Sequence, residues 1–497
     1  MQHPKKGIDA RLRAAADLVL EALEGVEKPV VADVGCDHGY LTAYLLRQRM
    51  DLRVIASDIS AASLRKAELL LDPGIYGDRV RFCVADGLEA LAGERVDAIV
   101  MAGMGGRLTL QMLQAGREQI GEAALILQAN TDIPLLRATL PELGFRILAE
   151  RYAEAAGRQY ALLLAGAGTQ STPGLRDAFL GMPGAATHVP GRERYLRAMR
   201  QKRMGEMQKA SLRHSSRGLD RLADIRRETD WIAEELEMKQ INVGELVSLI
   251  DTLAPFETAE EWDNVGLLLG SAKASVSRVL IALDVTAAVL EEATQLECQA
   301  IVSHHPFLFH AARRITDSDR EGALMLEMAR RGITHIAAHT NLDKAPGGMN
   351  DALLAALDLQ GRGEGFLRVA VLPEGMTFGQ LCERTAQRLQ AEIRTYGAPD
   401  TPVHALGCCS GAGAEEYRAA MAQGADCFLT GEVRHNVALD ALHDGCLVIE
   451  AGHFETERPG CEALRASLQK AADELQYNVI FFASDADALE RGTMRRA

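Results

Sequence analysis

Residues 30–41 read Val-Val-Ala-Asp-Val-Gly-Cys-Asp-His-Gly-Tyr-Leu. Apolar residues lead into Asp33, Gly35 follows two residues later, and Gly39 follows four residues after that. In nucleotide-binding α/β folds a first β-strand turns into a first helix with this pattern, because glycine permits a sharp turn and a close approach of a ligand to the main chain. The spacing Asp-x-Gly-x-x-x-Gly differs from the dinucleotide pattern Gly-x-Gly-x-x-Gly. It therefore predicts a ligand without a phosphate, such as S-adenosylmethionine, in contact with Asp33 and Gly35.

Three further apolar runs follow, and each ends in acidic or glycine residues. Residues 53–58 end in Asp58, where such folds hydrogen-bond a pair of ribose hydroxyls. Residues 80–87 place an acid suited to an adenine amino group after the next run, and residues 96–106 end in a glycine-rich turn. Each acid alone could instead cap the following helix, but the set fits ligand binding better. The predicted cofactor-binding residues are Asp33, Gly35, Asp58, Asp86, Gly87, Ala102, Gly103 and Met104.

The bulk properties exclude several classes of protein. A chain of 497 residues is too long for one ordinary core, and its 47% hydrophobic and 25% charged residues are typical of globular domains. No apolar run approaches the ~18 residues that span a bilayer, and residues 1–24 predict a charged amphipathic helix rather than a signal peptide. Nine cysteines without a Cys-x-x-Cys pair predict neither a disulfide framework nor a zinc finger. We therefore expect a cytoplasmic protein of several domains with no membrane partner.

Four segments of the first half form a specific combination. They read Asp-Val-Gly-Cys-Asp-His-Gly-Tyr-Leu at 33–41, Ala-Asp-Gly-Leu-Glu at 85–89, Met-Ala-Gly-Met-Gly-Gly at 101–106 and Leu-Gln-Ala-Asn at 127–130. Over residues 8–240 the chain resembles the TrmK-type tRNA (adenine-22)-N1-methyltransferases. The resemblance implies a Rossmann-like class I methyltransferase fold, S-adenosylmethionine as the cofactor and tRNA as the substrate.

Methyl transfer to adenine N1 is a single in-line displacement by a ring nitrogen whose lone pair is available at neutral pH. It needs orientation, and a group that accepts a hydrogen bond from the exocyclic amine, more than it needs a strong base. Asp37 is the predicted acceptor, and its carboxylate would also stabilise the positive charge that develops on the ring. His38 and Tyr40 are predicted to position or stack the adenine, although packing at the start of the helix explains them equally well. Because N1 lies on the pairing edge, the base must be unpaired or flipped.

The middle of the chain changes in composition and charge. Residues 166–190 hold Gly, Pro, Ser and Thr and predict a linker, whereas residues 191–227 contain twelve Lys/Arg against four Asp/Glu in a chain with a net charge of −15. Apolar residues recur at helical spacing from Leu219 to Leu236, which predicts a helical hairpin with one apolar seam. A charge run usually marks only a solvated helix face. Beside a candidate tRNA enzyme, however, it predicts a basic arm that follows phosphates.

A new α/β domain opens at Ile241, where Asn242 is predicted to start a helix, and its later apolar runs end in histidines and carboxylates. Such runs precede His304-His305-Pro306, His339-Thr340-Asn341-Leu342-Asp343, Gly431-Glu432-Val433-Arg434-His435 and Gly452-His453-Phe454-Glu455-Thr456-Glu457. We expect these four strand ends to meet at one edge of a sheet. Neutral imidazoles together with carboxylates match a divalent metal with mixed nitrogen and oxygen ligands. The number of such groups predicts a two-metal cluster of the kind that activates water in hydrolases.

These segments, with Glu-Trp-Asp-Asn-Val-Gly-Leu at 261–267 and Pro-Gly-Gly-Met-Asn-Asp at 346–351, resemble the NIF-three-like family, also described as GTP cyclohydrolase I type 2 homologues. The resemblance covers residues 241 to about 490 and implies ring-shaped hexamers of two-lobed subunits with the metal site between the lobes. It implies that two divalent ions, whether Zn, Fe, Mn or Mg, are bound by His304, His305, Asp343, His453 and Glu457. Glu432 and His435 would stand near the metals as proton-transfer groups, and Asp263 and Asn264 would shape the pocket.

The sequence thus predicts an α/β protein in three parts. They are a Rossmann-like methyltransferase domain at 1–165, a linker and a basic, coiled-coil-like tRNA-binding extension at 166–240, and a two-lobed NIF-three-like di-metal domain at 241–497. The first part is expected to methylate N1 of an adenine in tRNA, and the last to form a homo-oligomer and to hydrolyse a nucleotide as a GTP cyclohydrolase does. The alternative is a methyltransferase of a small molecule or protein, fused to a metal-binding scaffold or regulatory domain without turnover.

Overall fold

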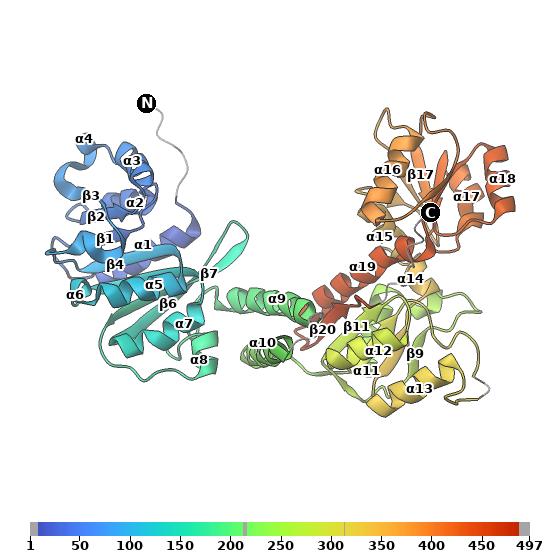
Figure 1. Ribbon diagram of the computed structural model, residues 1–497, viewed down its shortest axis with the longest axis horizontal. Coiled ribbons are helices and arrows are strands. Elements are labelled where there is room, and N and C mark those ends of the chain that lie inside the picture. The colour runs from blue at the N-terminus through green and yellow to red at the C-terminus, as the bar shows by residue number, and fades with distance from the viewer. Residues whose placement is uncertain (1–7, 212–215, 313, 487–497) are drawn as a thin grey trace, which may run out of the picture. The chain divides into compact units, whose positions relative to one another are not determined.

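The computed structural model describes residues 8–211, 216–312 and 314–486. They form two compact units (Figure 1). The first comprises the described residues up to Met207 together with Leu219–Leu236, and the second comprises the described residues of 208–218 and those from Glu237 onward. Of the helices in these ranges, none combines the length and the apolar character that crossing a membrane requires.

A seven-stranded sheet forms the centre of the first unit. Its strands are β1 (Val30–Val34), β2 (Arg53–Asp58), β3 (Val80–Val84), β4 (Ala98–Gly105), β5 (Ala124–Thr131), β6 (Phe145–Ala155) and β7 (Arg158–Ala167). They lie in the order β3-β2-β1-β4-β5-β7-β6, and β7 runs antiparallel to both of its neighbours whereas the other pairs are parallel. The strand order therefore reverses between β1 and β4, the point at which open α/β sheets bind ligands. The four predicted strands are confirmed.

Helices cover both faces of this sheet because side chains alternate along each strand. The covering helices include α1 (Ala10–Ala22), α2 (Tyr40–Gln48), α5 (Gly106–Ala115) and α7 (Ile133–Thr139). Val31 and Val54 pack with α1 and α2 on one face, and Ala32 and Ile99 pack with α5 and α7 on the other. The predicted N-terminal helix begins after Asp9, whose side chain caps it, and the first seven residues of that prediction lie outside the described residues.

The segment predicted as a linker, residues 166–190, is part of the core of the first unit. β7 extends into it, and α8 (Leu175–Leu180) places Phe179 and Leu180 in the same apolar cluster as α5 and α7. The prediction was wrong because the Gly, Pro, Ser and Thr content of the segment hides one short apolar run. Packing of that run against the sheet outweighs the local preference for an irregular chain.

A fully buried ion pair fixes α8 in this position. Arg137 of α7 binds Glu150 of β6 through two hydrogen bonds, Nε to Oε1 at 3.0 Å and Nη2 to Oε2 at 2.7 Å, and neither side chain is exposed. The Nη1 atom donates to the carbonyl oxygens of Ala178 and Phe179 at 3.0 and 3.1 Å. Glu150 also accepts a hydrogen bond from the backbone N–H of Met182. Because every charged atom has a partner, the pair can be buried without a large penalty.

The predicted helical hairpin is present as α9 (Arg192–Ser211) and α10 (Ser216–Glu235), which are joined by ion pairs between the two helices. Its predicted seam is buried at Leu222, Ile225 and Ile232. The side chain of Leu219, where the seam was predicted to begin, lies outside the described residues. Ile232 also belongs to the apolar core of the first unit, so the hairpin is anchored to the seven-stranded sheet.

The second unit contains two large sheets, one in each of two lobes, and a small two-stranded sheet of β8 (Ile241–Asn242) and β10 (Ser275–Val276). The first lobe holds a five-stranded sheet in the order β20 (Ile480–Ala483), β11 (Arg278–Ala282), β12 (Ala300–Ser303), β13 (Thr334–Ala337) and β9 (Gly266–Leu269). The second lobe holds a six-stranded sheet in the order β14 (Gly361–Arg362), β15 (Arg368–Val371), β17 (Ala405–Cys408), β18 (Cys427–Thr430), β19 (Leu447–Glu450) and β16 (Arg394–Tyr396).

The expectation that four strand ends meet at one edge of one sheet is therefore wrong. The runs before His304 and His339 are β12 and β13 of the first lobe, whereas those before Glu432 and His453 are β18 and β19 of the second lobe. All four runs are short and apolar, and such a pattern does not encode which strands become neighbours. The two sheets instead deliver their polar ends to a common place between the lobes.

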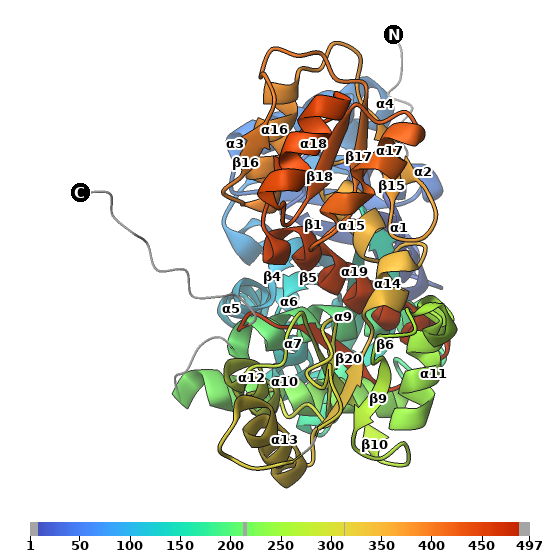
Figure 2. The ribbon, with the colours of Figure 1, turned by 90° about the vertical axis from the view of Figure 1, so that its right-hand side faces the viewer.

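One long helix, α19 (His453–Glu474), lies between the two sheets (Figure 2). Its first turn follows β19 of the second lobe, and its later turns place Leu464 and Leu468 in the core of the first lobe. The predicted helix start at Asn242 is confirmed, because Asn242 and Glu245 form a reciprocal capping box at the beginning of α11 (Val243–Leu253). The two lobes thus share one continuous helix.

Replacing Glu150 with Gln should destabilise the first unit by about 3–5 kcal/mol, because Arg137 would keep its charge in a buried site without a counter-charge. Urea denaturation followed by circular dichroism measures the change. The matched control is Glu234→Gln, since Glu234 pairs with Arg176 at the surface, where its side chain is 61% exposed and the pair contributes at most about 1 kcal/mol. Equal stability of the two variants would contradict an anchoring role for the buried pair.

Candidate functional site

A cavity of about 880 Å³ opens at the carboxyl ends of β1, β2 and β4. Its lining includes all the residues predicted to bind the cofactor and the three predicted to act on adenine: Asp33, Gly35, Asp37, His38, Tyr40, Asp58, Asp86, Gly87, Ala102, Gly103 and Met104. Gly35 has a φ of +74°, and a Cβ at this position would lie 2.5 Å from Cε of Met104. The turn after β1 therefore requires glycine.

Asp33 is the buried acid of this cavity. Its side chain is almost inaccessible, and its Oδ2 atom accepts a hydrogen bond from the Thr42 hydroxyl at 2.6 Å. Burial raises the pKa of Asp33 to about 6 against the opposing effect of the Thr42 hydrogen bonds, and the nearby charge of Asp58 adds to the rise. The ionised form of Asp33 would be stabilised by a cationic ligand.

Asp58 organises the turn that follows β1. Its carboxylate accepts hydrogen bonds from the backbone N–H groups of Asp37 at 3.0 Å and Ser60 at 2.8 Å. Asp37 has a φ of +46°, and its exposed carboxylate lies 2.7 Å from Nδ1 of His38. The rings of His38 and Tyr40 are nearly parallel, with centroids 5.9 Å apart. A hydrogen-bond acceptor and two stacked rings thus stand together at the cavity.

A network that the sequence did not predict holds the glycine-rich turn after β4. The Oε1 atom of Gln128 accepts hydrogen bonds from the N–H of Gly103 at 3.0 Å and from Nη1 of Arg11 at 2.7 Å. Asn130 donates from Nδ2 to the Gly103 carbonyl at 2.8 Å, and both Asn130 and Arg11 line the cavity. The Leu-Gln-Ala-Asn segment was a signal for Gln128 and Asn130. No local pattern points to Arg11, which lies 117 residues from its partner.

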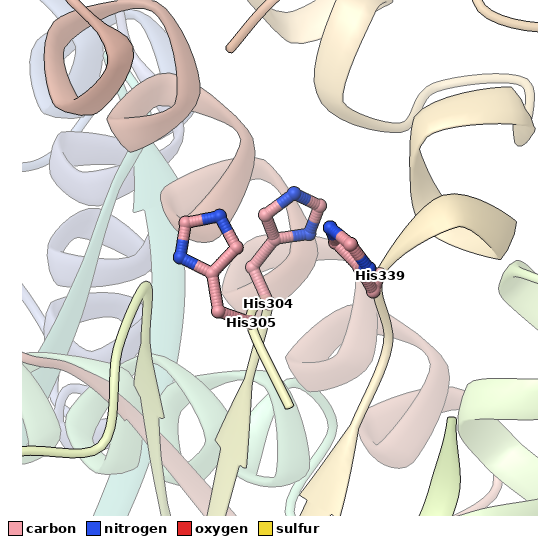
Figure 3. Close-up of side chains that lie close together, drawn as sticks. All are labelled: His304, His305 and His339. Carbon is pink, nitrogen blue, oxygen red and sulfur yellow. The ribbon is translucent and has the colours of Figure 1, made fainter. Parts of the chain in front are cut away.

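In the second unit, His304, His305 and His339 gather beyond the ends of β12 and β13 (Figure 3). The Oε2 atom of Glu457, in the first turns of α19, lies 3.2 Å from Nε2 of His305 and 3.2 Å from Nε2 of His453. The Nε2 atom of His304 lies 3.6 Å from Oδ1 of Asp343. The five residues predicted as metal ligands are therefore assembled between the two lobes. His339, which was not predicted as a ligand, lies with them.

Each imidazole uses Nδ1 to contact an oxygen atom and leaves Nε2 for the centre of the cluster. The contacts are His304 with the Ala338 carbonyl at 3.0 Å, His305 with Asp284 at 3.0 Å, His339 with Asp263 at 2.9 Å and His453 with Glu432 at 2.9 Å. Metal-binding histidines are oriented in this way, because the oxygen fixes the proton on Nδ1 and leaves a lone pair on Nε2.

The two residues predicted as proton-transfer groups occupy different positions. Glu432 lies at Nδ1 of His453, on the side of that ring that faces away from the cluster. His435 is the exposed first residue of α18 (His435–Asp444) and is not among the residues that line the cavity at the cluster. The structure thus brings Glu432 to a ligand and leaves His435 outside the cavity.

Unpaired polar atoms show that the cluster fits a metal. Nε2 of His304, Oδ1 of Asp343 and Oε2 of Glu457 are buried and have no hydrogen-bond partner within residues 8–211, 216–312 and 314–486. Such atoms are costly to bury, and one nitrogen with two carboxylate oxygens is a donor set that a divalent cation satisfies. The backbone at Gly411 packs so closely against the site that a side chain would not fit, since a Cβ there would lie 2.3 Å from Oε1 of Glu457.

The protonation state of His304 and the charges of the two carboxylates support the same conclusion. Burial lowers the pKa of His304 to about 3, so its ring is neutral, which is the form that binds metals. Burial, and then the charge of Glu457, raises the pKa of Asp343 well above its ordinary value. Burial alone would raise the pKa of Glu457 as well, but the rings of His305 and His453, whose Nε2 atoms each lie 3.2 Å from Oε2, outweigh it and hold this pKa below its usual range. A cation between the two carboxylates would remove their repulsion.

Comparison with known proteins identifies the second unit. A family model described as Duf34/NIF3 (NGG1p interacting factor 3) matches residues 241–488. A Clostridium acetobutylicum protein named GTP cyclohydrolase 1 type 2 homolog is 32% identical over 250 residues, which are 48% of this chain and 93% of that protein. The chain belongs to the Duf34/NIF3 family. A Streptomyces coelicolor protein of the same name is 34% identical over 248 residues, 46% of this chain and 87% of that protein.

The match to Duf34/NIF3 covers the second unit, and a different family matches the first. A model described as Methyltransferase domain matches residues 8–163, so the first unit carries a methyltransferase domain. The solved structure of the B. subtilis M1A22 tRNA methyltransferase TrmK has 23% sequence identity to the chain and a TM-score of 0.40, over 46% of this chain and 98% of that one. The chain is therefore a fusion of a methyltransferase domain with a Duf34/NIF3 domain.

We predict that the affinity for S-adenosylmethionine rises about tenfold between about pH 5 and pH 7, because the cationic cofactor favours the ionised form of Asp33, whose pKa is about 6. Isothermal titration calorimetry over this range measures it. Asp33→Asn should bind more weakly at pH 7 and lose the dependence on pH. Asp86→Asn, at the same cavity, should weaken binding but keep the dependence, because Asp33 is intact. The same pH dependence in wild type and Asp33→Asn would contradict the assignment.

Proposed function

We propose that the first unit transfers a methyl group from S-adenosylmethionine to N1 of an adenine in tRNA, at the adenine-22 position that the sequence resemblance implies. The observation that carries this proposal is the cavity at the ends of β1, β2 and β4. It is lined by the acids predicted to bind the cofactor and by Asp37, the predicted hydrogen-bond acceptor for the target adenine. The match to a methyltransferase family supports the class of reaction.

Each polar group of the cavity has a role in this proposal. When bound, S-adenosylmethionine would supply a methyl group on a sulfonium, whose leaving group is a neutral thioether that needs no proton from an acid. Asp58 holds the ribose hydroxyls and Asp86 the amino group of the cofactor's adenine, while Asp33 attracts its positive charge. Asp37 accepts a hydrogen bond from the exocyclic amine of the target adenine and stabilises the positive charge that develops on its ring. The parallel rings of His38 and Tyr40 position that adenine by stacking.

The helical hairpin supports tRNA as the substrate, although it offers fewer free cations than its composition suggests. Among its described residues, ion pairs occupy at least five arginines: Arg192 with Glu235, Arg197 with Glu193, Arg203 with Glu228, Arg221 with Glu206 and Arg227 with Asp224. Arg194, Lys202 and Lys209 are exposed and form no ion pair within the described part of the chain. We propose that these three contact phosphates of the tRNA.

We propose that the second unit binds two divalent metal ions through His304, His305, Asp343, His453 and Glu457 and acts as a hydrolase of the kind that the name of its relatives suggests. Bound ions would supply Lewis acidity and would lower the pKa of a water molecule. Within the protein, the Nδ1 contacts orient the ligands, and Glu432 can exchange a proton with the ring of His453. A scaffold without turnover is the alternative. The open cavity beside the ligands favours chemistry, because structural metal sites are closed.

The assembly of the protein is inferred from the resemblance of its second unit to the NIF-three-like family, and its location from its cysteines. We propose a ring-shaped homo-oligomer formed through the second unit. No disulfide joins the nine cysteines, all of which lie in the described part of the chain, and we propose the reducing cytoplasm as the location of the protein.

The test of the first activity is methyl transfer from labelled S-adenosylmethionine to unmodified tRNA transcripts, followed by mapping of the modified base. The wild type should methylate N1 of a single adenine, and Asp37→Asn should lower kcat about a hundredfold. Asn tolerates the φ of +46° at this position, so the cofactor affinity should not change. Asp78→Ala removes an exposed acid outside the cavity and serves as the control. Cofactor binding without any transfer to tRNA would contradict the proposed substrate.

The same assay tests the hairpin. Its deletion would be uninformative, because Tyr195 and Ile232 belong to the core of the first unit. The double variant Arg194→Glu, Lys202→Glu should instead raise KM for tRNA about tenfold at low salt and less at high salt, with unchanged cofactor affinity. An enzyme that methylates a small molecule would be insensitive to this change.

The test of the metal site is the metal content of the purified full chain. Mass spectrometry should find two divalent ions per chain, and a chelator should lower the thermal midpoint because the ions bind the folded state. Glu457→Gln should lose at least one ion, whereas Glu462→Gln, on the exposed side of the same helix, should keep both. Hydrolysis of a nucleotide that stops on chelation supports the enzyme. Full metal content without turnover supports the scaffold.

A further inference from the structure

The cavity beside the metal ligands has an aromatic wall for which the proposed metal chemistry has no use. The cavity has a volume of about 460 Å³ and is lined by four of the predicted ligands, His305, Asp343, His453 and Glu457, and also by Trp262, Phe309 and Phe366. Trp262 is 59% exposed and Phe309 is 39% exposed. Large aromatic rings that are left open inside a cavity mark a surface for a ligand.

Trp262 and Phe309 form a corner next to the metal cluster. Their ring centroids lie 5.8 Å apart at an interplanar angle of 47°. The edge of the wall meets the cluster at His339, whose ring lies 6.2 Å from that of Trp262 and 6.3 Å from that of Phe309. A ligand ring that packs against this corner would therefore be adjacent to the metal-binding groups.

Buried hydrogen bonds hold the two exposed rings in place. Asp263, directly after Trp262, has a fully buried side chain that contacts Nδ1 of His339 at 2.9 Å and accepts a hydrogen bond from the Thr340 N–H at 3.0 Å. The next residue, Asn264, donates from Nδ2 to the carbonyl of Leu308 at 2.5 Å, directly before Phe309. The corner is thus preorganised in the absence of a ligand, which lowers the entropic cost of binding.

We propose that this wall is a nucleobase-binding subsite, in which the base of a nucleotide substrate lies against Trp262 and Phe309. The inference rests on the proposed hydrolase function and names the residues that recognise the base of its substrate. A base offers a flat π-face for the two rings and a polar edge for lining residues such as Ser410 and Glu416, whereas its phosphate is drawn to the divalent ions. A purely aliphatic ligand would leave these polar groups unsatisfied.

The chain offers a specific reporter for this subsite. It contains two tryptophans, Trp231 in the first unit and Trp262 in the cavity. In the full-length Trp231→Phe variant, loaded with metal, guanosine 5′-monophosphate should quench the fluorescence of Trp262 in a saturable way. Ribose 5-phosphate, which has the same sugar and phosphate but no base, should bind at least about tenfold more weakly. S-adenosylhomocysteine is present throughout to occupy the cofactor cavity of the first unit.

Substitutions separate a base-binding role from a structural one. Phe309→Ala should weaken the binding of guanosine 5′-monophosphate about tenfold or more without changing the metal content. Ile315→Ala is the matched control, because Ile315 is 52% exposed in the same loop but does not line the cavity. Equal binding of ribose 5-phosphate and guanosine 5′-monophosphate, or unchanged binding by Phe309→Ala, would overturn the proposal.

The outcomes also distinguish this inference from the proposed function. Base-dependent quenching in a protein that hydrolyses no nucleotide would uphold the subsite and reject the hydrolase. Metal-dependent hydrolysis of a substrate without a base, together with the absence of quenching, would uphold the hydrolase and reject the subsite.

Discussion

The carboxylates of Asp343 and Glu457 are buried beside the His304 ring, 3.6 and 3.8 Å from its Nε2 atom, and the cost of burying them together governs the side chains around them. Asp343 comes from α14 (Thr340–Lys344), directly after β13 of the first lobe, whereas Glu457 comes from α19. Burying two like charges without compensation costs several kcal/mol. The side chains around the two carboxylates are arranged accordingly. The rings of His304, His305 and His453 direct Nε2 toward the cluster, because a carbonyl or a carboxylate binds the Nδ1 atom of each ring. Gly411 lets the backbone pass close to Glu457.

Both units place chemistry where parallel strands end, and this is why much of each site could be predicted from the sequence. Asp33, Asp58 and Asp86 each follow an apolar run, as do His304 and His305. In a parallel sheet such ends lie side by side, so local patterns along the chain become neighbours in space. The fold of the first unit and the closeness of His304, His305 and Asp343 followed from this rule, whereas His453 and Glu457 follow a strand of the other lobe. The functional roles of these residues stay predictions.

The rest could not be predicted, because it depends on contacts between distant parts of the chain. Hydrophobic periodicity identified the strands before His304 and Glu432 but not that they belong to different sheets. The position of Arg11 at Gln128 depends on how α1 packs across the sheet, and no local pattern encodes this contact. The burial of α8 could not be predicted from its own segment, which is rich in glycine and proline. It depends on Arg137, which binds Glu150 and donates a hydrogen bond to a carbonyl oxygen of α8.

The long helix α19 sets a rule for how this site can vary. Its first turns carry His453 and Glu457, and its later turns are fixed by the packing of Leu464 and Leu468 in the first lobe. An inserted or deleted residue between these two parts would rotate the ligands by about 100° around the helix axis, away from the other ligands. The number of residues between Glu457 and Leu464 therefore cannot change by one without turning the side chain of Glu457 away from the cluster. Loops around the cavity carry no such restriction, so the lining of the cavity can change while the positions of His453 and Glu457 stay constant.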